Sequence, residues 1–316
     1  MENSVAFLKA FGSYLPDRVV TNAEIGARVG CDAEWIRNVS GIDERRFARD
    51  DESVTDLALR AAQDCLERAK VKASELGMIL VASGSSERQF PGPAASVANR
   101  LGLNATPCLD MAMASAGSLF GISLASRLCA SLGPILVIGA EKMSRIVERE
   151  PMERGVAILF GDGAGACLVD PSNGFARVLD CGLYSDGAYA EDLKLPFSSP
   201  LEMNGRSVIL QASRKIPRAI ATLLEQHRKR AADVAVFLMH QANQNLIVRV
   251  AQALEVAEDK FYSNIRKFGN TSSASMLIAA AEWSRSNKLA PGETLCFAAF
   301  GAGFHWGALL AEGSEP

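Results

Sequence analysis

A serine, a histidine and an asparagine lie in three separate segments, and the local pattern places each of them beside a helix. Ser115 lies in LDMAMASAGSLFGISLA (109–125), where a strand-like apolar run gives way to small residues and then to a helical pattern. A side chain at such a turn lies near free backbone N–H groups and the positive end of the helix dipole, which stabilise developing negative charge. This setting suits a nucleophile whose acyl intermediate passes through an oxyanion. Serine is also a preferred helix N-cap, and the segment alone favours that structural role.

The other two polar residues also have two interpretations each. His240 ends the apolar run in VFLMHQANQNLI, and Asn270 lies in the turn of KFGNTSSASMLIAAAEW. Neutral imidazole can donate or accept a proton near pH 7, as acid–base chemistry and thioester polarisation require, but a lone histidine here is as often a core residue. The asparagine amide can donate to a carbonyl oxygen, although asparagine in such a turn commonly satisfies local backbone groups. Each signal is weak by itself, and together they suggest acyl chemistry.

The elements that would position these residues alternate between short apolar runs and longer helical patterns. Strands are predicted in the N-terminal segment and in the runs 78–82, 108–113, 134–140, 156–160, 235–239 and 294–300. These runs are almost continuously apolar, which is typical of strands buried on both faces. A helix is predicted to begin at Ser53, with Asp56 as its capping-box partner. The alternation predicts an α/β fold with helices covering the sheets.

A weak internal repeat divides the chain. FGDGAGACLVD (160–170) is similar to FGAGFHWGALL (300–310). Two unrelated glycine-rich hairpins would give the same pattern, because glycine allows tight turns and close approaches. The turn-like PSNG segment (171–174) is the expected boundary between an N-terminal half, residues 1–172, and a C-terminal half, residues 173–316.

Composition excludes several classes of protein. The net charge is −3 and charged residues make up 22%, so nucleic acid is not an expected partner. No apolar run approaches the roughly 20 residues of a membrane helix, and the N-terminal segment lacks the pattern of a signal peptide. Seven cysteines without a CxxC pair, and three scattered histidines, predict a cytoplasmic protein with reduced thiols and no metal site.

Over nearly its whole length the chain resembles the β-ketoacyl-acyl carrier protein synthase III family of thiolase-fold condensing enzymes. The segments that carry the resemblance are DAEWIRNVSGIDERR (32–46), ERQFPGPAASVANRLGL (87–103), LDMAMASAGS (109–118), RGVAILFGDGAGA (154–166), HQAN (240–243), GNTSSAS (269–275) and AFGAGFHWG (299–307). The histidine–asparagine pair of HQAN and GNTS is the most specific of these. The resemblance implies an α/β thiolase-like fold in which two similar halves form a five-layered αβαβα arrangement.

The resemblance also implies a role for particular residues. Ser115 matches the nucleophile, and His240 and Asn270 match the pair that holds a malonyl thioester during decarboxylation. The backbone N–H groups of Ser115 and of the glycine-rich loop near Ala302 would form the oxyanion hole. Coenzyme A would be bound by residues that match the family's adenine sandwich and pantetheine tunnel: Trp35, Arg154, Gly155, Gly205, Ile209, Ala242 and Asn243. The acyl pocket would include Phe90, Met113 and Met203, with Phe90 reaching into the partner subunit of a homodimer. Acyl-CoA is the implied substrate, without a permanently bound cofactor.

Two features depart from the family pattern. The nucleophile is usually a cysteine, and a serine hydroxyl needs a base where a thiol is partly ionised. Ser115 is either an introduced Cys→Ser change that traps substrate or a natural variant with an unusual starter unit. Neutral residues also stand where a basic patch usually recruits acyl carrier protein: Leu210, Asn245, Gln252 and Ala253.

We therefore predict a decarboxylative Claisen condensation of an acyl-CoA starter with a malonyl thioester, with acyl carrier protein as an implied partner. Two rival functions remain open on the sequence. One is an acyltransferase that passes the acyl group to a small-molecule acceptor, with His240 as general base. The other is a thiol-less protein that binds acyl-CoA without turnover.

Overall fold

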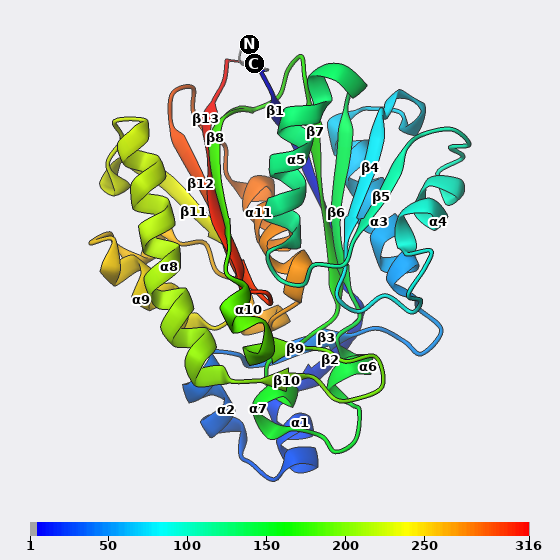
Figure 1. The fold of residues 1–316 in the computed structure, drawn as a ribbon, viewed down its shortest axis with the longest axis vertical. Helices are drawn as coiled ribbons and strands as arrows, with labels where there is room; N and C mark the ends of the chain where they lie inside the picture. The colour runs from blue at the N-terminus through cyan, green and yellow to red at the C-terminus, as the bar shows by residue number, and fades with distance from the viewer. Residues whose placement is uncertain (1–4, 316) are drawn as a thin grey trace.

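The computed structural model describes residues 5–315, which form an α/β fold around a nine-stranded mixed sheet (Figure 1). The sheet has the strand order β11-β12-β13-β8-β1-β7-β6-β4-β5. Its strands are β1 (Phe7–Tyr14), β4 (Met78–Ala82), β5 (Cys108–Met111), β6 (Ile135–Glu141), β7 (Gly163–Asp170), β8 (Ala176–Ser185), β11 (Val234–Met239), β12 (Thr294–Gly301) and β13 (His305–Gly313). Two small ribbons pair β2 (Arg18–Thr21) with β3 (Glu44–Phe47), and β9 (Leu193–Lys194) with β10 (Glu202–Met203).

The sheet has two wings, β5-β4-β6-β7-β1 and β11-β12-β13-β8. The α-helices cover the outer faces of both wings and fill the space between them. They are α1 (Asn22–Val29), α2 (Ala33–Ser40), α3 (Val54–Ala69), α4 (Pro93–Arg100), α5 (Gly117–Leu132), α6 (Ser144–Val147), α7 (Arg154–Ala157), α8 (Gly205–Gln226), α9 (Gln244–Ala253), α10 (Ile265–Phe268) and α11 (Ser275–Ser286). Short 3₁₀ turns are η1 (Ala73–Glu75), η2 (Gly187–Asp192), η3 (Ala231–Asp233), η4 (Glu258–Lys260) and η5 (Ser272–Ala274).

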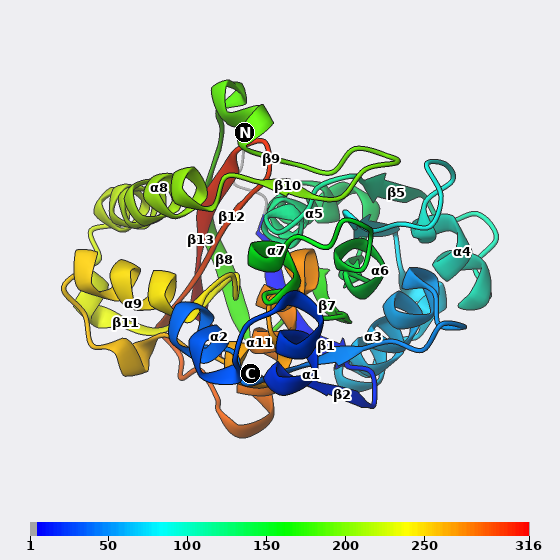
Figure 2. The same cartoon turned by 90° about the horizontal axis from the view of Figure 1, so that it is seen from below.

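The layers follow from which faces these helices contact. Helices α5 and α11 lie between the two wings, where α5 packs on strands of both wings and α11 packs on β7, β1 and β11 (Figures 1 and 2). Helices α3 and α4 cover the outer face of one wing, and α8 and α9 cover the outer face of the other. The result is the predicted succession of helix, sheet, helix, sheet and helix layers.

The two wings run through the same strand order. The strands of each wing can be numbered by their order along the chain. Across the first wing, β5-β4-β6-β7-β1, they then run third, second, fourth, fifth and first. The second wing, β11-β12-β13-β8, runs second, third, fourth and first, which is the same order without a strand in the position that β5 holds in the first wing. In its place Phe261 makes a single parallel bridge to Phe237 of β11. We infer from this correspondence that the chain consists of two similar halves, 1–172 and 173–316, joined through the turn between β7 and β8.

Most sequence-predicted elements are present. The apolar runs at 78–82, 134–140, 235–239 and 294–300 correspond to β4, β6, β11 and β12, and β6 is buried throughout. The capping box of Ser53 and Asp56 begins α3 as predicted. The run at 108–113 ends early, at Met111, and is partly exposed because β5 is the outer strand of the sheet.

The strand predicted at 156–160 is wrong. The side chain of Glu153 caps a short helix there, α7, and Phe160 forms only one isolated bridge, to Asn270. Val156 and Phe160 are nonetheless buried, in a cluster with residues of α1, α2 and β3. The run is therefore apolar because it is a core segment, and burial alone does not distinguish a strand from a short helix.

Beneath the layers, α1, α2, α6, α7 and the two small ribbons form a cap (Figure 1). Arg45 of β3 is fully buried in it and donates to Val20 O, Asn22 Oδ1 and Ile158 O. Burial lowers the pKa of Arg45 to about 10, which leaves the side chain charged at neutral pH. The guanidinium thereby ties the N-terminal part of the cap to the α7 segment.

Candidate active site

Ser115 lies between β5 and α5, in a backbone conformation that is rare for a residue with a side chain. Its φ is 60°, and its side chain is almost buried. Left-handed backbone at a non-glycine residue is costly and is maintained only where the surroundings require it. The helix N-cap is Ala116, without a side-chain capping bond, so the hydroxyl of Ser115 does not cap α5. The structural role that the local sequence favoured for this serine is therefore absent.

The turn that carries Ser115 packs directly on β12. A Cβ atom on Gly301 would lie 2.6 Å from the Ala114 carbonyl oxygen and 2.8 Å from the Cβ of Ser115. Only glycine allows this close approach. Strand β12 of the second wing thus contacts the chain at Ser115.

His240 is held at the end of β11 by two hydrogen bonds. Its backbone N–H donates to Ala298 O at 2.9 Å, and its Nδ1 lies 2.6 Å from Ser275 Oγ. The same hydroxyl oxygen accepts the Gln241 N–H at 3.0 Å. Because a hydroxyl has one proton to donate, this arrangement is fully satisfied when Ser275 donates to Nδ1 and Nε2 carries the ring proton. Burial lowers the pKa of His240 to about 4, so the ring is neutral at pH 7.

Asn270 is oriented by the loop that follows it. Its Oδ1 accepts the Ser272 N–H at 2.8 Å, which fixes the amide plane, and its Nδ2 makes only a long 3.5 Å contact with Ala242 O. Ser272 Oγ in turn accepts the N–H of Ser115 at 3.0 Å. The Ser115 turn, Ser272 and Asn270 therefore form one connected set, and the Asn270 amide nitrogen retains hydrogen-bonding capacity.

The Ser272 contact changes the predicted oxyanion hole. The resemblance predicts that the backbone N–H of Ser115 is one of its two donors, but here that group donates to the Ser272 hydroxyl. A developing oxyanion must compete with Ser272 Oγ for this N–H. Ala302, the second predicted position, lines the same cavity as Ser115 and Ser272.

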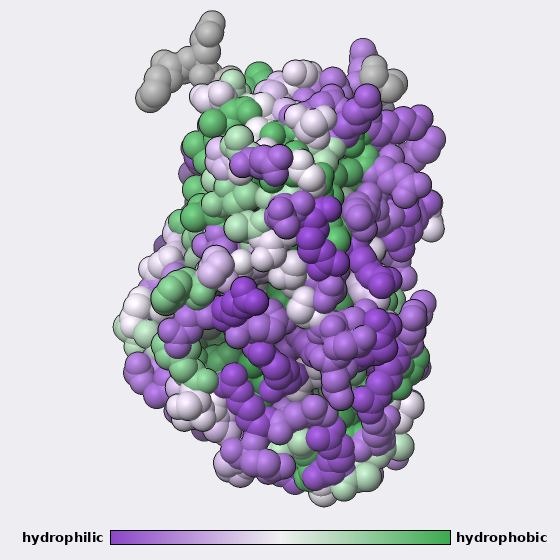
Figure 3. Space-filling model, turned by 90° about the vertical axis from the view of Figure 1, so that its right-hand side faces the viewer, coloured by the Kyte–Doolittle hydropathy of each residue, from purple (hydrophilic) through white to green (hydrophobic). Residues whose placement is uncertain are grey.

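That cavity has a volume of about 920 Å³. Met113 lines it, as predicted for the acyl pocket, whereas Phe90 and Met203 do not. The ring of Phe90 is instead 85% exposed, and Phe197 on a facing loop is 81% exposed. Both rings are therefore largely exposed to solvent. The side of the molecule that lies to the right in Figure 1 carries apolar patches among polar ones (Figure 3).

The residues predicted to bind coenzyme A occupy the cap and the two helix starts above it. The Arg154 guanidinium lies over the Trp35 ring, with 5.1 Å between Cζ and the ring centroid, and Gly155 follows it in α7. Gly205 and Ile209 lie in the first two turns of α8, and Ile209 is 37% exposed. Trp35 and Arg154 are therefore brought together as the sequence predicted.

The start of α9 has a more structural role than the sequence indicated. Asn243 caps α9, and its Nδ2 donates to Val39 O at 2.9 Å. Asn245 donates to the same carbonyl. The amide of Asn243 therefore joins α9 to the end of α2, while Ala242 next to it remains half-buried.

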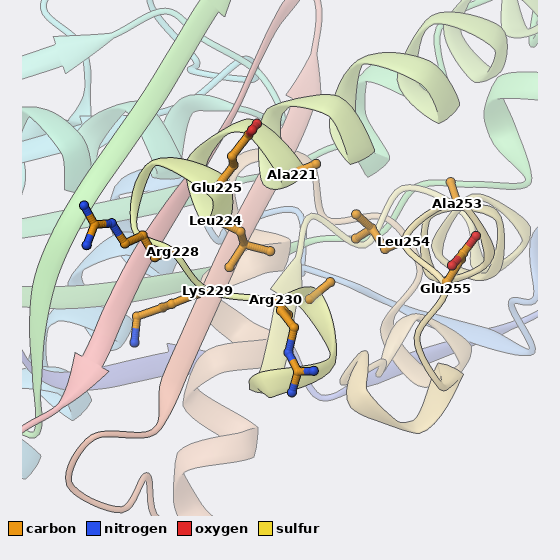
Figure 4. Close-up of a pocket in the computed structure, with 10 residues that line it drawn as sticks. Ala221, Leu224, Glu225, Arg228, Lys229, Arg230, Ala253, Leu254 and Glu255 are labelled. Atoms are coloured by element: carbon orange, nitrogen blue, oxygen red, sulfur yellow. The ribbon is translucent and has the colours of Figure 1, made fainter.

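Sequence reasoning did not find the groups that position these side chains. Glu141 is fully buried and accepts hydrogen bonds from Gly84 N, Ser85 Oγ and Ser273 N. Ser273 Oγ donates to Ala82 O. The run of hydroxyl residues after Asn270, next to a helix of small residues, was the available signal for this network. A separate hollow between the ends of α8 and α9, lined by Leu224, Arg228 and Leu254, contains none of the predicted site residues (Figure 4).

Two family models match the chain. The model described as 3-oxoacyl-[acyl-carrier-protein] synthase III matches residues 109–187, and the model of its C-terminal region matches residues 224–312. A β-ketoacyl-[acyl-carrier-protein] synthase III from Pectobacterium atrosepticum is 37% identical over 310 residues, which cover 95% of this chain and 96% of the relative. One from Listeria welshimeri is 34% identical over 301 residues, with 95% and 96% coverage.

Solved structures agree with these matches. The 3-oxoacyl-[acyl-carrier-protein] synthase III of Aquifex aeolicus superposes with a TM-score of 0.93 at 32% identity, covering 97% of this chain and 99% of the other. The priming β-ketosynthase of the R1128 polyketide biosynthetic pathway gives 0.90 at 28% identity, with 98% and 97% coverage. The fold and the site thus define an α/β protein of the thiolase-like class. Within that class, the chain belongs to the 3-oxoacyl-[acyl-carrier-protein] synthase III family.

Among residues 5–315, no helix is long and apolar enough to cross a membrane, and no group of histidine, cysteine, aspartate or glutamate side chains could hold a metal ion.

Proposed function

We propose that the chain catalyses the decarboxylative condensation of an acyl-CoA starter with a malonyl thioester, with acyl carrier protein as the malonyl carrier. The observation that carries this proposal is the connected set of hydrogen bonds joining Ser115 to Ser272 and Asn270, together with a buried neutral His240. These side chains come from both halves of the chain, and family membership supports the same reaction.

In the first step, Ser115 Oγ attacks the thioester carbonyl carbon of acyl-CoA, and the coenzyme A thiol leaves. The acyl group then occupies the 920 Å³ cavity that Ser115 and Met113 line. The positive end of the α5 dipole next to Ser115 stabilises the oxyanion that forms during attack.

In the second step, the malonyl thioester carbonyl oxygen accepts hydrogen bonds from His240 Nε2–H and Asn270 Nδ2–H. The bond to the carboxylate breaks, carbon dioxide leaves, and the electron pair is held as an enolate by these two donors. The enolate carbon attacks the acyl-serine carbonyl, and Ser115 Oγ leaves and takes a proton from water. A low imidazole pKa suits this role, because the ring must donate a hydrogen bond without becoming charged.

Coenzyme A would enter through the cap. We propose that its adenine stacks between Trp35 and Arg154, and that pantetheine passes Gly205, Ile209 and Ala242. A base stacked between two planar groups lies about 3.5 Å from each of them, so the two groups must be roughly 7 Å apart. The 5.1 Å between Arg154 Cζ and the Trp35 ring centroid must therefore increase when adenine binds. Arg154 is exposed and can move to allow this.

We further propose a cytoplasmic homodimer that joins its subunits along β5. The strand is an unpaired edge, Leu109 on it is 44% exposed, and the Phe90 ring lies outside the cavity of its own chain. Sedimentation velocity tests this proposal. The wild-type chain should sediment as a dimer and Phe90→Asp should shift toward monomer, whereas a monomeric wild-type chain would contradict it.

The acyl-enzyme step is tested by intact-protein mass spectrometry after incubation with a panel of acyl-CoAs. The wild-type chain and Ser115→Cys should gain the mass of one acyl group, and Ser115→Ala should not. Addition of malonyl-acyl carrier protein should then release a β-ketoacyl product, which Asn270→Ala should suppress. A small-molecule ester instead of that product would favour the acyltransferase function. Absence of acylation in both the serine and the cysteine forms would refute the assignment of position 115.

A further inference from the structure

His305 has no part in the reaction described above, yet it lies beside the nucleophile. It is the first residue of β13, after the loop that carries Ala302 and Gly303. Its neighbours across the sheet are Gly301 of β12 and Ser185 of β8. Both His305 and Ser115 line the 920 Å³ cavity.

The register of the sheet determines which way His305 faces. Directly opposed residues of an antiparallel pair project from the same face, with Cβ atoms about 5 Å apart. His305 opposes Gly301, whose missing Cβ would point at Ser115 and lie 2.8 Å from the Cβ of that residue. The imidazole therefore emerges toward α5, where it packs edge-on against the Phe120 ring at 5.7 Å.

These relations bound the separation of the two side chains. The Cβ atoms of Ser115 and His305 lie within roughly 8 Å of each other, from the 2.8 Å contact at Gly301 and one cross-strand spacing. A serine Oγ and an imidazole Nε2 in hydrogen-bond contact need Cβ atoms on the order of 7 Å apart. The ring is therefore within reach of the serine hydroxyl after a small side-chain adjustment.

The second ring nitrogen is held in the manner of a catalytic base. His305 Nδ1 lies 2.7 Å from Ser185 Oγ, and when Nδ1–H donates to this hydroxyl, the Nε2 lone pair is available. Gly303 leaves room for the Nε2 edge of the His305 ring, because a Cβ atom on residue 303 would lie 2.3 Å from Nε2. Burial also lowers the pKa of His305, so the ring is neutral and able to accept a proton at pH 7.

We propose that His305 is the general base that activates Ser115 for acylation, with Ser185 as its positioning residue. The inference rests on the proposed function, because it assigns the proton of the first step. His305 Nε2 takes the proton of the Ser115 hydroxyl as Oγ bonds to the thioester carbonyl carbon. The tetrahedral oxyanion then collapses, the carbon–sulfur bond breaks, and the leaving thiolate takes the proton from the imidazolium, which gives the acyl serine, free coenzyme A thiol and a neutral histidine.

The division of work between the two histidines follows from their surroundings. His240 is buried, its Nδ1 is bound to Ser275, and its Nε2–H is needed as a donor to the malonyl carbonyl. A serine, unlike a thiol, is not ionised at neutral pH and depends on an adjacent base. His305 supplies that base from within the acyl cavity.

The test is the rate of acylation of position 115, measured by intact mass against time, for His305→Gln in two backgrounds. In the wild-type background, loss of the base should slow acylation by on the order of 10²- to 10⁴-fold. In the Ser115→Cys background, the same change should slow acylation less than about tenfold, because the thiol ionises by itself. His227→Gln, on the remote end of α8, is the matched control and should acylate at the wild-type rate. Free imidazole should partly restore a His305→Ala variant, whose truncation opens space in the cavity.

Equal slowing in both backgrounds would overturn the proposal, since it would mean that His305 only maintains the shape of the site. Unchanged acylation in His305→Gln would overturn it as well, and so would a wild-type chain that is never acylated while Ser115→Cys is. The proposed function fails separately, if neither acylated form yields a β-ketoacyl product with malonyl-acyl carrier protein.

Discussion

The hydroxyl of Ser275 allows the role of His240 to be tested quantitatively. Ser275 is 1% exposed, and its oxygen serves His240 Nδ1 at 2.6 Å and Gln241 N at 3.0 Å. Ser275→Ala leaves both partners buried without a hydrogen bond, at about 1–3 kcal/mol each, so the free energy of unfolding should fall by roughly 2–6 kcal/mol. The bond also selects the tautomer that carries its proton on Nε2. Losing a preference of about 1–2 kcal/mol should slow decarboxylation by roughly 5- to 30-fold.

The assay is release of carbon dioxide from malonyl-CoA, together with chemical denaturation. In the proposed mechanism this release needs His240 and Asn270 but not Ser115. Ser284→Ala is the matched control, because Ser284 lies on the same helix and makes one hydrogen bond, to Ala281 O at 3.0 Å. The free energy of unfolding of Ser284→Ala should fall by no more than about 1 kcal/mol, and its rate of decarboxylation should equal that of the wild-type chain. If Ser275→Ala decarboxylates as fast as this control, the tautomer argument is wrong, whatever happens to stability.

Three further predictions concern other parts of the site. Because the pKa of His240 is near 4 in the fold and about 6.5 in the unfolded chain, the unfolded state binds more protons between these values, and stability falls as pH falls. From pH 7.5 to 5 the wild-type chain should lose about 2 kcal/mol more than His240→Gln in parallel denaturation curves, and equal slopes would contradict the assigned burial. Glu141→Gln should lower the free energy of unfolding by roughly 2–3 kcal/mol, because an amide nitrogen would face backbone and hydroxyl donors; unchanged denaturation would show that these donors find other partners. Gly301→Ala should slow acylation of Ser115 by about 10²-fold while the fold survives, since its Cβ would lie 2.6 Å from Ala114 O, and wild-type acylation would show that the turn yields without cost.

Much of the fold could be predicted from hydrophobic patterns, because the buried strands have no polar face. β6 is buried at every position, and its predicted limits differ from the observed ones by one residue at each end. The segment 156–160 looked equally apolar, but it lies within the cap, where its first two residues end the short helix α7. Its burial comes from residues of α1, α2 and β3, distant in sequence, which a local pattern cannot include.

The site, too, could be predicted from the sequence only in part. Ser115, His240 and Asn270 could be proposed from the ends of strands and from the family resemblance, but their orientation depends on contacts across long stretches of chain. Ser272 is 157 residues from Ser115, and Ser275 is 35 residues from His240. His305 looked like an ordinary strand residue, because only the register of β12 and β13 places it opposite Gly301.

The hydrogen bond between Ser115 N–H and Ser272 Oγ has a consequence for the motions of the site. The amide belongs to the first half of the chain, but its acceptor belongs to the second. That acceptor lies in the loop whose Ser273 N–H donates to the buried Glu141 carboxylate. Hydrogen exchange at this amide therefore requires the Ser272 loop to open, even if the sheet around Ser115 stays intact. The Ser115 amide thus reports on a loop that lies 157 residues away in the sequence, and local opening of the loop after Asn270 should appear first as faster exchange of the Ser115 amide proton.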